Sequence, residues 1–211
     1  MREDVYRKLR EEVLSCTIMP GQSLHENDLA DRFGVSKSPI RDALIRLEAD
    51  GLVTVQSRKG YRVAPVSVSD AGDLYELRST LEAAVVSIVA ESASTKDLAE
   101  LDRYRDPEPW REKGGFIAYN REFHCSVALL CRNRRLSAAA LDLIEQFDRL
   151  TVISVAVVGS YSDDRPLAEH NAIIDELQAR EPRKAARLLT RHLERGRRRV
   201  TNALSQAAIT L

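Results

Sequence analysis

The chain has 211 residues with 32 basic and 32 acidic side chains, so its formal net charge is zero. Its three cysteines are too few for a disulfide framework and lie in no metal-ligating spacing, which fits a reducing cytosol. No apolar run reaches membrane length and no signal peptide is recognisable, so we expect a cytoplasmic protein. Residues 1–66 contain eleven basic and ten acidic side chains, which is no general basic footprint for nucleic acid.

The first elements in chain order predict a helix-turn-helix. Apolar residues at helical spacing predict a helix over Val5–Cys16, and a second short helix is expected over Asp28–Phe33. Gly34 permits the positive φ of a tight turn, and Ser36 can cap a third helix. That helix directs inward Ile40, Ala43, Leu44 and Leu47, and outward Ser36, Lys37, Ser38 and Arg41. Such a helix can enter a DNA major groove, whereas the alternative is a pair of solvated amphipathic helices.

A β-hairpin is expected to follow the third helix. Gly51 ends the helix, Leu52–Gln56 alternates as a strand, and Tyr61–Ala64 returns as a second strand. The turn between the strands offers Arg58, Lys59 and the bare backbone of Gly60 to a groove or a phosphate. The hairpin completes a winged domain over residues 1–66.

The motifs of this region resemble the GntR family of bacterial transcription regulators. The resemblance lies in Met19–Ala30, Phe33–Leu44 and Gly51–Val53. It implies DNA contacts at Asn27, Ser36, Lys37, Ser38, Arg41, Lys59 and Gly60. Lys37 departs from the usual Arg, so a point charge replaces bidentate reading of a guanine. Asn27 stands where some members have Arg, so their base preference cannot be transferred.

Residues 67–211 are expected to form a second, all-helical domain, which makes the fold class mainly α. After the linker Pro65–Asp70, helices are predicted over Ala71–Ala93, Thr95–Arg103, Phe116–Cys131, Leu136–Val158, Arg165–Arg180 and Pro182–Leu204. The inward residues of the first are predicted to be Leu74, Leu77, Leu81, Ala84, Val85 and Ile88. The basic cluster Arg195–Arg199 is expected to offset the dipole at the end of the last helix.

Three histidines lie on the apolar stripes of three different predicted helices. They are His124, His170 and His192. Each alone is typical of a core histidine, but three together, with no inward acid to pair all of them, indicate one shared cation. Asn120 lies one helical turn before His124, so its amide oxygen can reach the same point. Imidazole ligands favour zinc or nickel, and this set leaves coordination positions open.

The second domain resembles the FCD effector domain of the FadR-like GntR subgroup. The resemblance lies in Arg78–Glu82, Asn120–His124, Glu169–His170 and Arg191–Leu193. It implies a helical bundle whose metal ligands are Asn120, His124, His170 and His192, with Arg78 near the effector pocket. Asn120 replaces the commoner Asp, so the site is expected to bind metal more weakly and to accept an anion more readily.

The expected function is ligand-responsive DNA binding, with repression as the expected mode. The protein is predicted to be a homodimer on an inverted repeat and not an enzyme. A small organic acid would bind the metal and Arg78, although Arg78 could instead form an exposed pair with Glu82. Two alternatives are a regulator with a purely structural metal and a metal-dependent hydrolase. A hydrolase needs a base beside the metal, and Glu122 and Glu169 are expected to face away.

Overall fold

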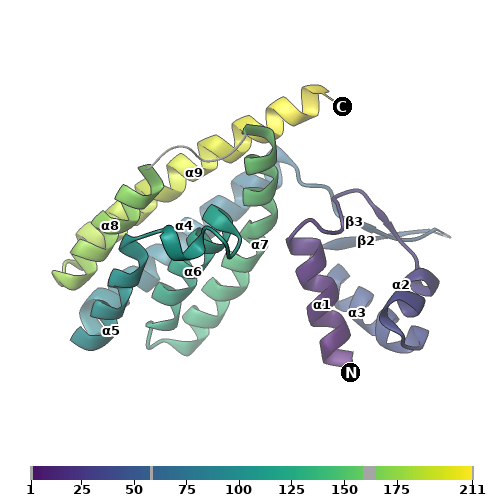
Figure 1. Cartoon of the computed structure of the whole chain (residues 1–211), viewed down its shortest axis with the longest axis horizontal. Coiled ribbons are helices and arrows are strands. Elements are labelled where there is room, and N and C mark those ends of the chain that lie inside the picture. Colours follow the sequence, from purple (N-terminus) through teal and green to yellow (C-terminus); the bar gives the residue numbers. More distant parts are fainter. Residues whose placement is uncertain (1, 58, 159–164, 211) are drawn as a thin grey trace. The chain divides into compact units, whose positions relative to one another are not determined.

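The computed structural model describes residues 2–57, 59–158 and 165–210 (Figure 1). Contacts within the chain divide it into two compact units, Met1–Val66 and Ser67–Leu211. The first unit combines three helices with a small antiparallel sheet, and the second is helical throughout its described residues. The mainly α class, with a winged helix-turn-helix first, is confirmed. No described helix is long and apolar enough to cross a membrane.

The first unit is a helix-turn-helix followed by a wing. Its elements are α1 (Arg2–Leu14), β1 (Ser23–Leu24), α2 (Glu26–Phe33), α3 (Lys37–Ala49), β2 (Val53–Gln56) and β3 (Gly60–Val63). Gly34 has a φ of 64° and ends α2 in the left-handed conformation, as expected for the turn. The expected inward face of α3 packs with α1 in one core around Leu9, Val13 and Leu44.

The sheet contains one strand that the sequence pattern did not predict. Its order is β1-β3-β2, and β1 pairs with β3 through Ser23 with Arg62 and Leu24 with Tyr61. Two residues are too few to produce a recognisable alternation, so only the pairing reveals this strand. Because β1 covers the free edge of β3, the wing is joined to the segment that leads into α2.

The second unit is a helical bundle. Its elements are α4 (Val68–Ser92), α5 (Thr95–Ala99), η1 (Glu100–Arg105), η2 (Glu108–Trp110), α6 (Gly115–Leu129), α7 (Arg134–Val158), α8 (Arg165–Gln178) and α9 (Pro182–Thr210). Ser67 caps α4 by accepting a hydrogen bond from the N–H of Asp70 at 3.0 Å. Helix α9 packs along α4 and also contacts α7 and α8 (Figure 1). The helix expected over Thr95–Arg103 instead changes to 3₁₀ geometry after Ala99.

The predicted inner face of α4 is largely wrong. Val85 is buried as expected, but Leu77 is 50% exposed and Ala84 is exposed. The buried face instead contains the pair Arg78 and Glu82, together with Ala71, Tyr75, Val86, Val89 and Ala90. Charged residues interrupt the apolar pattern of this face, so periodicity favoured the neighbouring face. An apolar stripe is therefore left partly exposed along α4.

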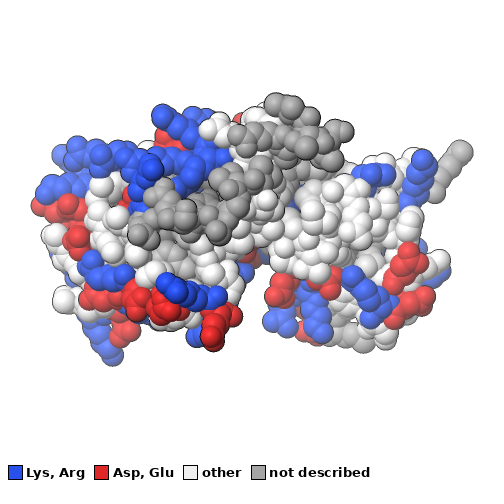
Figure 2. All heavy atoms as spheres, turned by 45° about the horizontal axis from the view of Figure 1, so that its top comes forward, with Lys and Arg blue, Asp and Glu red and all other residues white. Residues whose placement is uncertain are grey.

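The explanation offered for the Arg195–Arg199 cluster is also wrong. Helix α9 continues to Thr210, so the cluster lies within the helix and not at its C-terminus. Arg197 and Arg198 pair with Glu194, while Arg195 pairs with Glu169 of α8. Figure 2 shows Lys and Arg side chains gathered in a band where α9 crosses the second unit. Pairing with neighbouring acids accounts for these three arginines without a helix-dipole role.

Candidate functional site

The residues expected to contact DNA are exposed around the start of α3. Asn27 lies on α2, and Lys37, Ser38 and Arg41 lie in the first turns of α3. Ser36 occupies the N-cap position, but its side chain makes no capping hydrogen bond, contrary to the expected capping role. Its hydroxyl is exposed and does not serve the helix end. Of the wing residues, Lys59 is exposed, and Arg58 lies outside the described residues.

Arg41 is held in place by an acid that the sequence analysis did not identify. Its Nε and Nη2 donate to the two carboxylate oxygens of Glu26, at 2.9 and 2.7 Å. This planar two-point pair joins α3 to α2 and restricts the guanidinium to one orientation. The spacing of 15 residues between the partners is set by the helix-turn-helix angle, so no local sequence rule reveals it.

Gly60 is required by the geometry of the wing. Its φ is 86°, and a Cβ at this position would lie 2.7 Å from the carbonyl oxygen of Leu24. That oxygen belongs to β1, which pairs with β3 at this point. A side chain on residue 60 would therefore strain the backbone and also push the two strands apart.

We expect Gly60→Ala to destabilise the winged unit more than Gly51→Ala does. Gly51 also has a positive φ, of 71°, but nothing lies within 4 Å of its hypothetical Cβ. Both variants carry the backbone penalty of about 1 kcal/mol, and only Gly60→Ala adds the collision. Differential scanning calorimetry measures the difference. Equal melting temperatures in the two variants would contradict this account of the wing.

Three buried histidines of the second unit converge on one point. His124 of α6, His170 of α8 and His192 of α9 each offer a ring nitrogen, and these atoms lie within 4.8 Å of one another. The Nε2 atoms of His170 and His192 are 3.2 Å apart. The Nε2 of His124 is buried and has no hydrogen-bond partner among the described residues. The expectation that the three helices bring these side chains together is therefore matched by the geometry.

The opposite ring nitrogens fix the tautomers of the histidines. The Nδ1 of His124 donates to Glu82 at 2.5 Å, and the Nδ1 of His192 donates to Glu169 at 2.7 Å. Each carboxylate accepts a proton-bearing nitrogen, so both Nε2 atoms retain their lone pairs. Glu169 thus faces His192, contrary to the expectation that it turns away. Two inward acids exist, but each binds the ring nitrogen that points away from the common centre.

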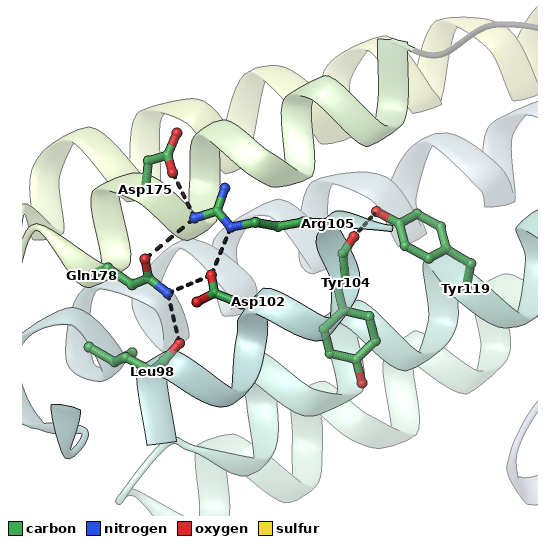
Figure 3. A network of polar contacts seen from close by, with 7 residues as sticks. All are labelled: Leu98, Asp102, Tyr104, Arg105, Tyr119, Asp175 and Gln178. Carbon is green, nitrogen blue, oxygen red and sulfur yellow. Dashed lines mark hydrogen bonds and ion pairs between the residues drawn. The ribbon is translucent and has the colours of Figure 1, made fainter. Parts of the chain in front are cut away.

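Tyr119 fixes the third histidine through a relay of hydrogen bonds. Its hydroxyl donates to the carbonyl oxygen of Tyr104 at 3.0 Å, as Figure 3 shows. The hydroxyl has one proton, so it must accept the hydrogen bond from the Nδ1 of His170 at 3.1 Å. His170 is then the third imidazole whose Nε2 lone pair faces the centre. Two such lone pairs at 3.2 Å repel each other unless a proton or a cation lies between them.

The segment that carries Tyr104 is itself anchored to α8. Arg105 of η1 contacts Asp102 and Asp175, each at 2.7 Å. Gln178 of α8 adds a hydrogen bond to the carbonyl oxygen of Leu98 at 3.1 Å (Figure 3). This network holds η1 against the helix that supplies His170, so the carbonyl of Tyr104 is fixed relative to the histidine.

Burial keeps the histidines neutral. It lowers the pKa of His124 to about 4 despite the nearby Glu82, and it lowers the pKa of His170 and His192 as well. Burial alone would raise the pKa of Glu82, but the adjacent Arg78 and His124 lower it to about 2. At neutral pH the site therefore contains three neutral imidazoles and an ionised Glu82.

Arg78 belongs to this buried site. Its Nε donates to Glu82, and its guanidinium carbon lies 4.5 Å from the centre of the Phe147 ring. Both members of the pair are at most 4% exposed, so the alternative of an exposed surface pair is wrong. One terminal nitrogen of Arg78 is buried without a hydrogen-bond partner among the described residues.

A cavity of about 20 Å³ lies beside the histidines. Arg78, Asn120 and His192 are among its lining residues. Asn120 is half-buried, on the same helix as His124 and one turn before it. The cavity thus brings together the expected fourth ligand, the expected effector-binding arginine and one of the three histidines.

The winged helix-turn-helix and the separate helical unit define a DNA-binding transcription regulator. Residues 1–63 match the gntR family of bacterial regulatory proteins, and residues 73–195 match the FCD domain. The chain belongs to the GntR family, in the group whose second domain is an FCD domain. The HTH-type transcriptional regulator YdhC of Bacillus subtilis (strain 168) is 27% identical over 194 residues, which cover 89% of this chain and 85% of that protein.

A second relative and a solved structure agree with this assignment. The HTH-type transcriptional repressor RspR of Escherichia coli (strain K12) is 26% identical over 198 residues, 92% of this chain and 86% of the repressor. The structure of E. coli McbR/YncC superposes with a TM-score of 0.82 at 20% identity, over 98% of each chain, which supports the fold.

The hydrolase alternative is set aside because the family and these relatives are regulators and not enzymes. The geometry gives it no help. Glu122 is exposed, and the carboxylates of Glu82 and Glu169 are occupied by the Nδ1 atoms of two histidines. These three acids therefore lack the position that a general base needs.

Proposed function

We propose that this regulator binds an operator as a homodimer and responds to a small organic acid through a divalent cation in its FCD domain. The observation that carries this proposal is the convergence of three Nε2 lone pairs on one buried point. DNA contact is assigned to Asn27, Ser36, Lys37, Ser38, Arg41, Lys59 and Gly60. Repression is the proposed mode, since RspR is named a repressor. The cytoplasm is the proposed location, because the operator is there.

The donor set fits a divalent cation. His124, His170 and His192 present neutral imidazoles, each oriented by a hydrogen bond at the opposite nitrogen. A cation would satisfy the buried Nε2 of His124 and relieve the repulsion between the Nε2 atoms of the other two. Asn120 is the proposed oxygen ligand. Imidazoles favour zinc or nickel over magnesium, and the bound cation would supply positive charge and open positions for an anionic oxygen.

The cavity beside the histidines is the proposed effector site. Arg78 lines it and has a buried nitrogen without a hydrogen-bond partner among the described residues. A carboxylate would satisfy that nitrogen through a charge-assisted hydrogen bond. Since α4 and α9 both line the cavity, the acid would affect how these helices pack. The remaining alternative is a metal that only stabilises the bundle.

Operator binding in the presence of acids tests the regulatory role. The zinc-loaded protein is titrated with small carboxylates while fluorescence anisotropy follows an operator selected from random duplex DNA. We expect at least one acid to change operator affinity by about 5- to 150-fold in the wild type, and to change it far less in Arg78→Ala. Equal responses in both proteins, or responses that persist without His124 and His192, would contradict the mechanism.

The exposed stripe of α4 supports the homodimer. It consists of Leu74, Leu77, Leu81 and Ile88, which recur at helical spacing. Three of them are half-buried and Leu77 is half exposed, so the stripe is an apolar surface that a second copy could cover. One short recognition helix contacts few base pairs, and a two-fold dimer supplies the second half-site of an inverted repeat.

We expect Leu77→Asp to weaken the dimer without unfolding the chain. A carboxylate at this position would be desolvated in the proposed interface, whereas the monomer leaves the side chain half exposed. Leu129→Asp is the matched control, because Leu129 is a 66% exposed leucine on α6. Sedimentation velocity at micromolar concentration measures the result. A wild-type monomer, or a Leu77→Asp dimer as stable as that of the control, would contradict the assignment.

A further inference from the structure

The cavity beside the histidines is lined by two arginines from different helices. Arg78 comes from α4 and Arg199 from α9. None of the described residues that line the cavity has a carboxylate, and the other polar ones include Asn120 and Thr151. The cavity therefore concentrates positive charge in a small space.

The nearest acid offsets only part of this charge. Glu82 accepts from Arg78 through Oε1 and from His124 through Oε2, so both of its oxygens are occupied. The three imidazoles and Asn120 carry no charge. With a divalent cation at the histidines, one carboxylate would leave a clear excess of positive charge. Two carboxylates on one ligand would compensate it better, because buried charges are stable only when paired.

We propose that the ligand of this cavity is a small dicarboxylate, with one carboxylate at Arg78 and the histidine cluster and the second at Arg199. The inference rests on the proposed function and adds the second anionic group of the effector. A guanidinium matches the planar, two-oxygen geometry of a carboxylate. Because the two arginines belong to α4 and α9, a dicarboxylate would link the helices that pack along each other in the bundle.

The size of the cavity limits the ligand to a short chain. A volume of about 20 Å³ is room for about one water molecule, so a diacid must displace side chains on binding. Arg199 and Phe116 are half-buried and reach the surface, so they can move without opening the core.

Calorimetric titration of the zinc-loaded protein with succinate and butyrate tests the inference. The two acids have the same number of carbons and differ in the second carboxylate. We expect succinate to bind about tenfold or more tightly than butyrate in the wild type. Arg199→Met should bring the two affinities within about twofold, and Arg199→Lys should restore part of the preference. Arg198→Met is the matched control, since Arg198 is exposed, pairs with Glu194 and does not line the cavity.

The outcomes separate this inference from the proposed function. Equal wild-type affinities for the two acids would overturn the dicarboxylate assignment and leave a carboxylate effector in place. An unchanged preference in Arg199→Met, with zinc affinity intact, would overturn the role of Arg199. Failure of both acids to bind the zinc-loaded wild type would overturn the carboxylate effector and the dicarboxylate together.

Discussion

Replacing His170 by alanine is expected to abolish stoichiometric zinc binding and to remove the response of the melting temperature to zinc. His170 is fully buried and presents its Nε2 to the other two histidines, so its loss leaves two imidazoles from α6 and α9. In the wild type, zinc at about 1,000 times its Kd should stabilise the fold by about 4 kcal/mol, and a chelator should reverse this. Calorimetric titration and thermal melting, each with and without chelator, measure both effects.

Two further variants make this result specific. His25→Ala replaces the fourth histidine, which is exposed in the first unit, and should leave zinc binding unchanged. Tyr119→Phe removes the acceptor of the His170 Nδ1 proton and keeps all three Nε2 atoms, so zinc affinity should fall about 10- to 100-fold. If His170→Ala bound zinc as the wild type does, the histidine site would be wrong.

Arg41→Ala is expected to weaken specific operator binding by about 1–3 kcal/mol, which is about 5- to 150-fold. Arg41 is exposed near the start of α3, and Glu26 fixes its guanidinium before DNA arrives. Glu26→Gln keeps the guanidinium but loosens its orientation, so a smaller loss is expected from that variant. Anisotropy titration of the selected operator, at one fixed salt concentration, gives the affinities.

Arg46→Ala is the matched control for this prediction. Arg46 is also an exposed arginine of α3 that is paired with an acid, Glu3, but it lies in the last turn of the helix. It should leave operator affinity within about twofold of the wild type. Wild-type affinity in a folded Arg41→Ala protein, or equal losses in both arginine variants, would refute the assignment of Arg41.

The winged unit could be predicted closely because its signals are local. A glycine at the turn, a proline in the first turn of α3 and the alternation before and after Gly60 each act within a few residues. The same locality explains what was missed. The Glu26 and Arg41 pair and the strand β1 depend on how distant segments meet, which a single sequence does not encode in any short pattern.

The histidine cluster was predictable in its members but not in its supports. His124, His170 and His192 stood out because each is a polar residue on an apolar stripe. Their partners Glu82 and Glu169 could not be assigned, since that requires the rotation of each helix against its neighbours. The rotation of α4 was predicted wrongly, because the buried Arg78 and Glu82 pair made the true inner face resemble a surface. The apolar stripe that misled the prediction is the surface now proposed for the dimer.

X-ray absorption spectroscopy of the protein loaded with one equivalent of zinc tests the central claim most directly. The geometry of the three oriented imidazoles predicts one bound zinc per chain, with three imidazole nitrogens and oxygen in its first shell and no sulfur. A first shell with fewer than three imidazoles, a sulfur ligand, or zinc that is lost on desalting would contradict the proposed metal site.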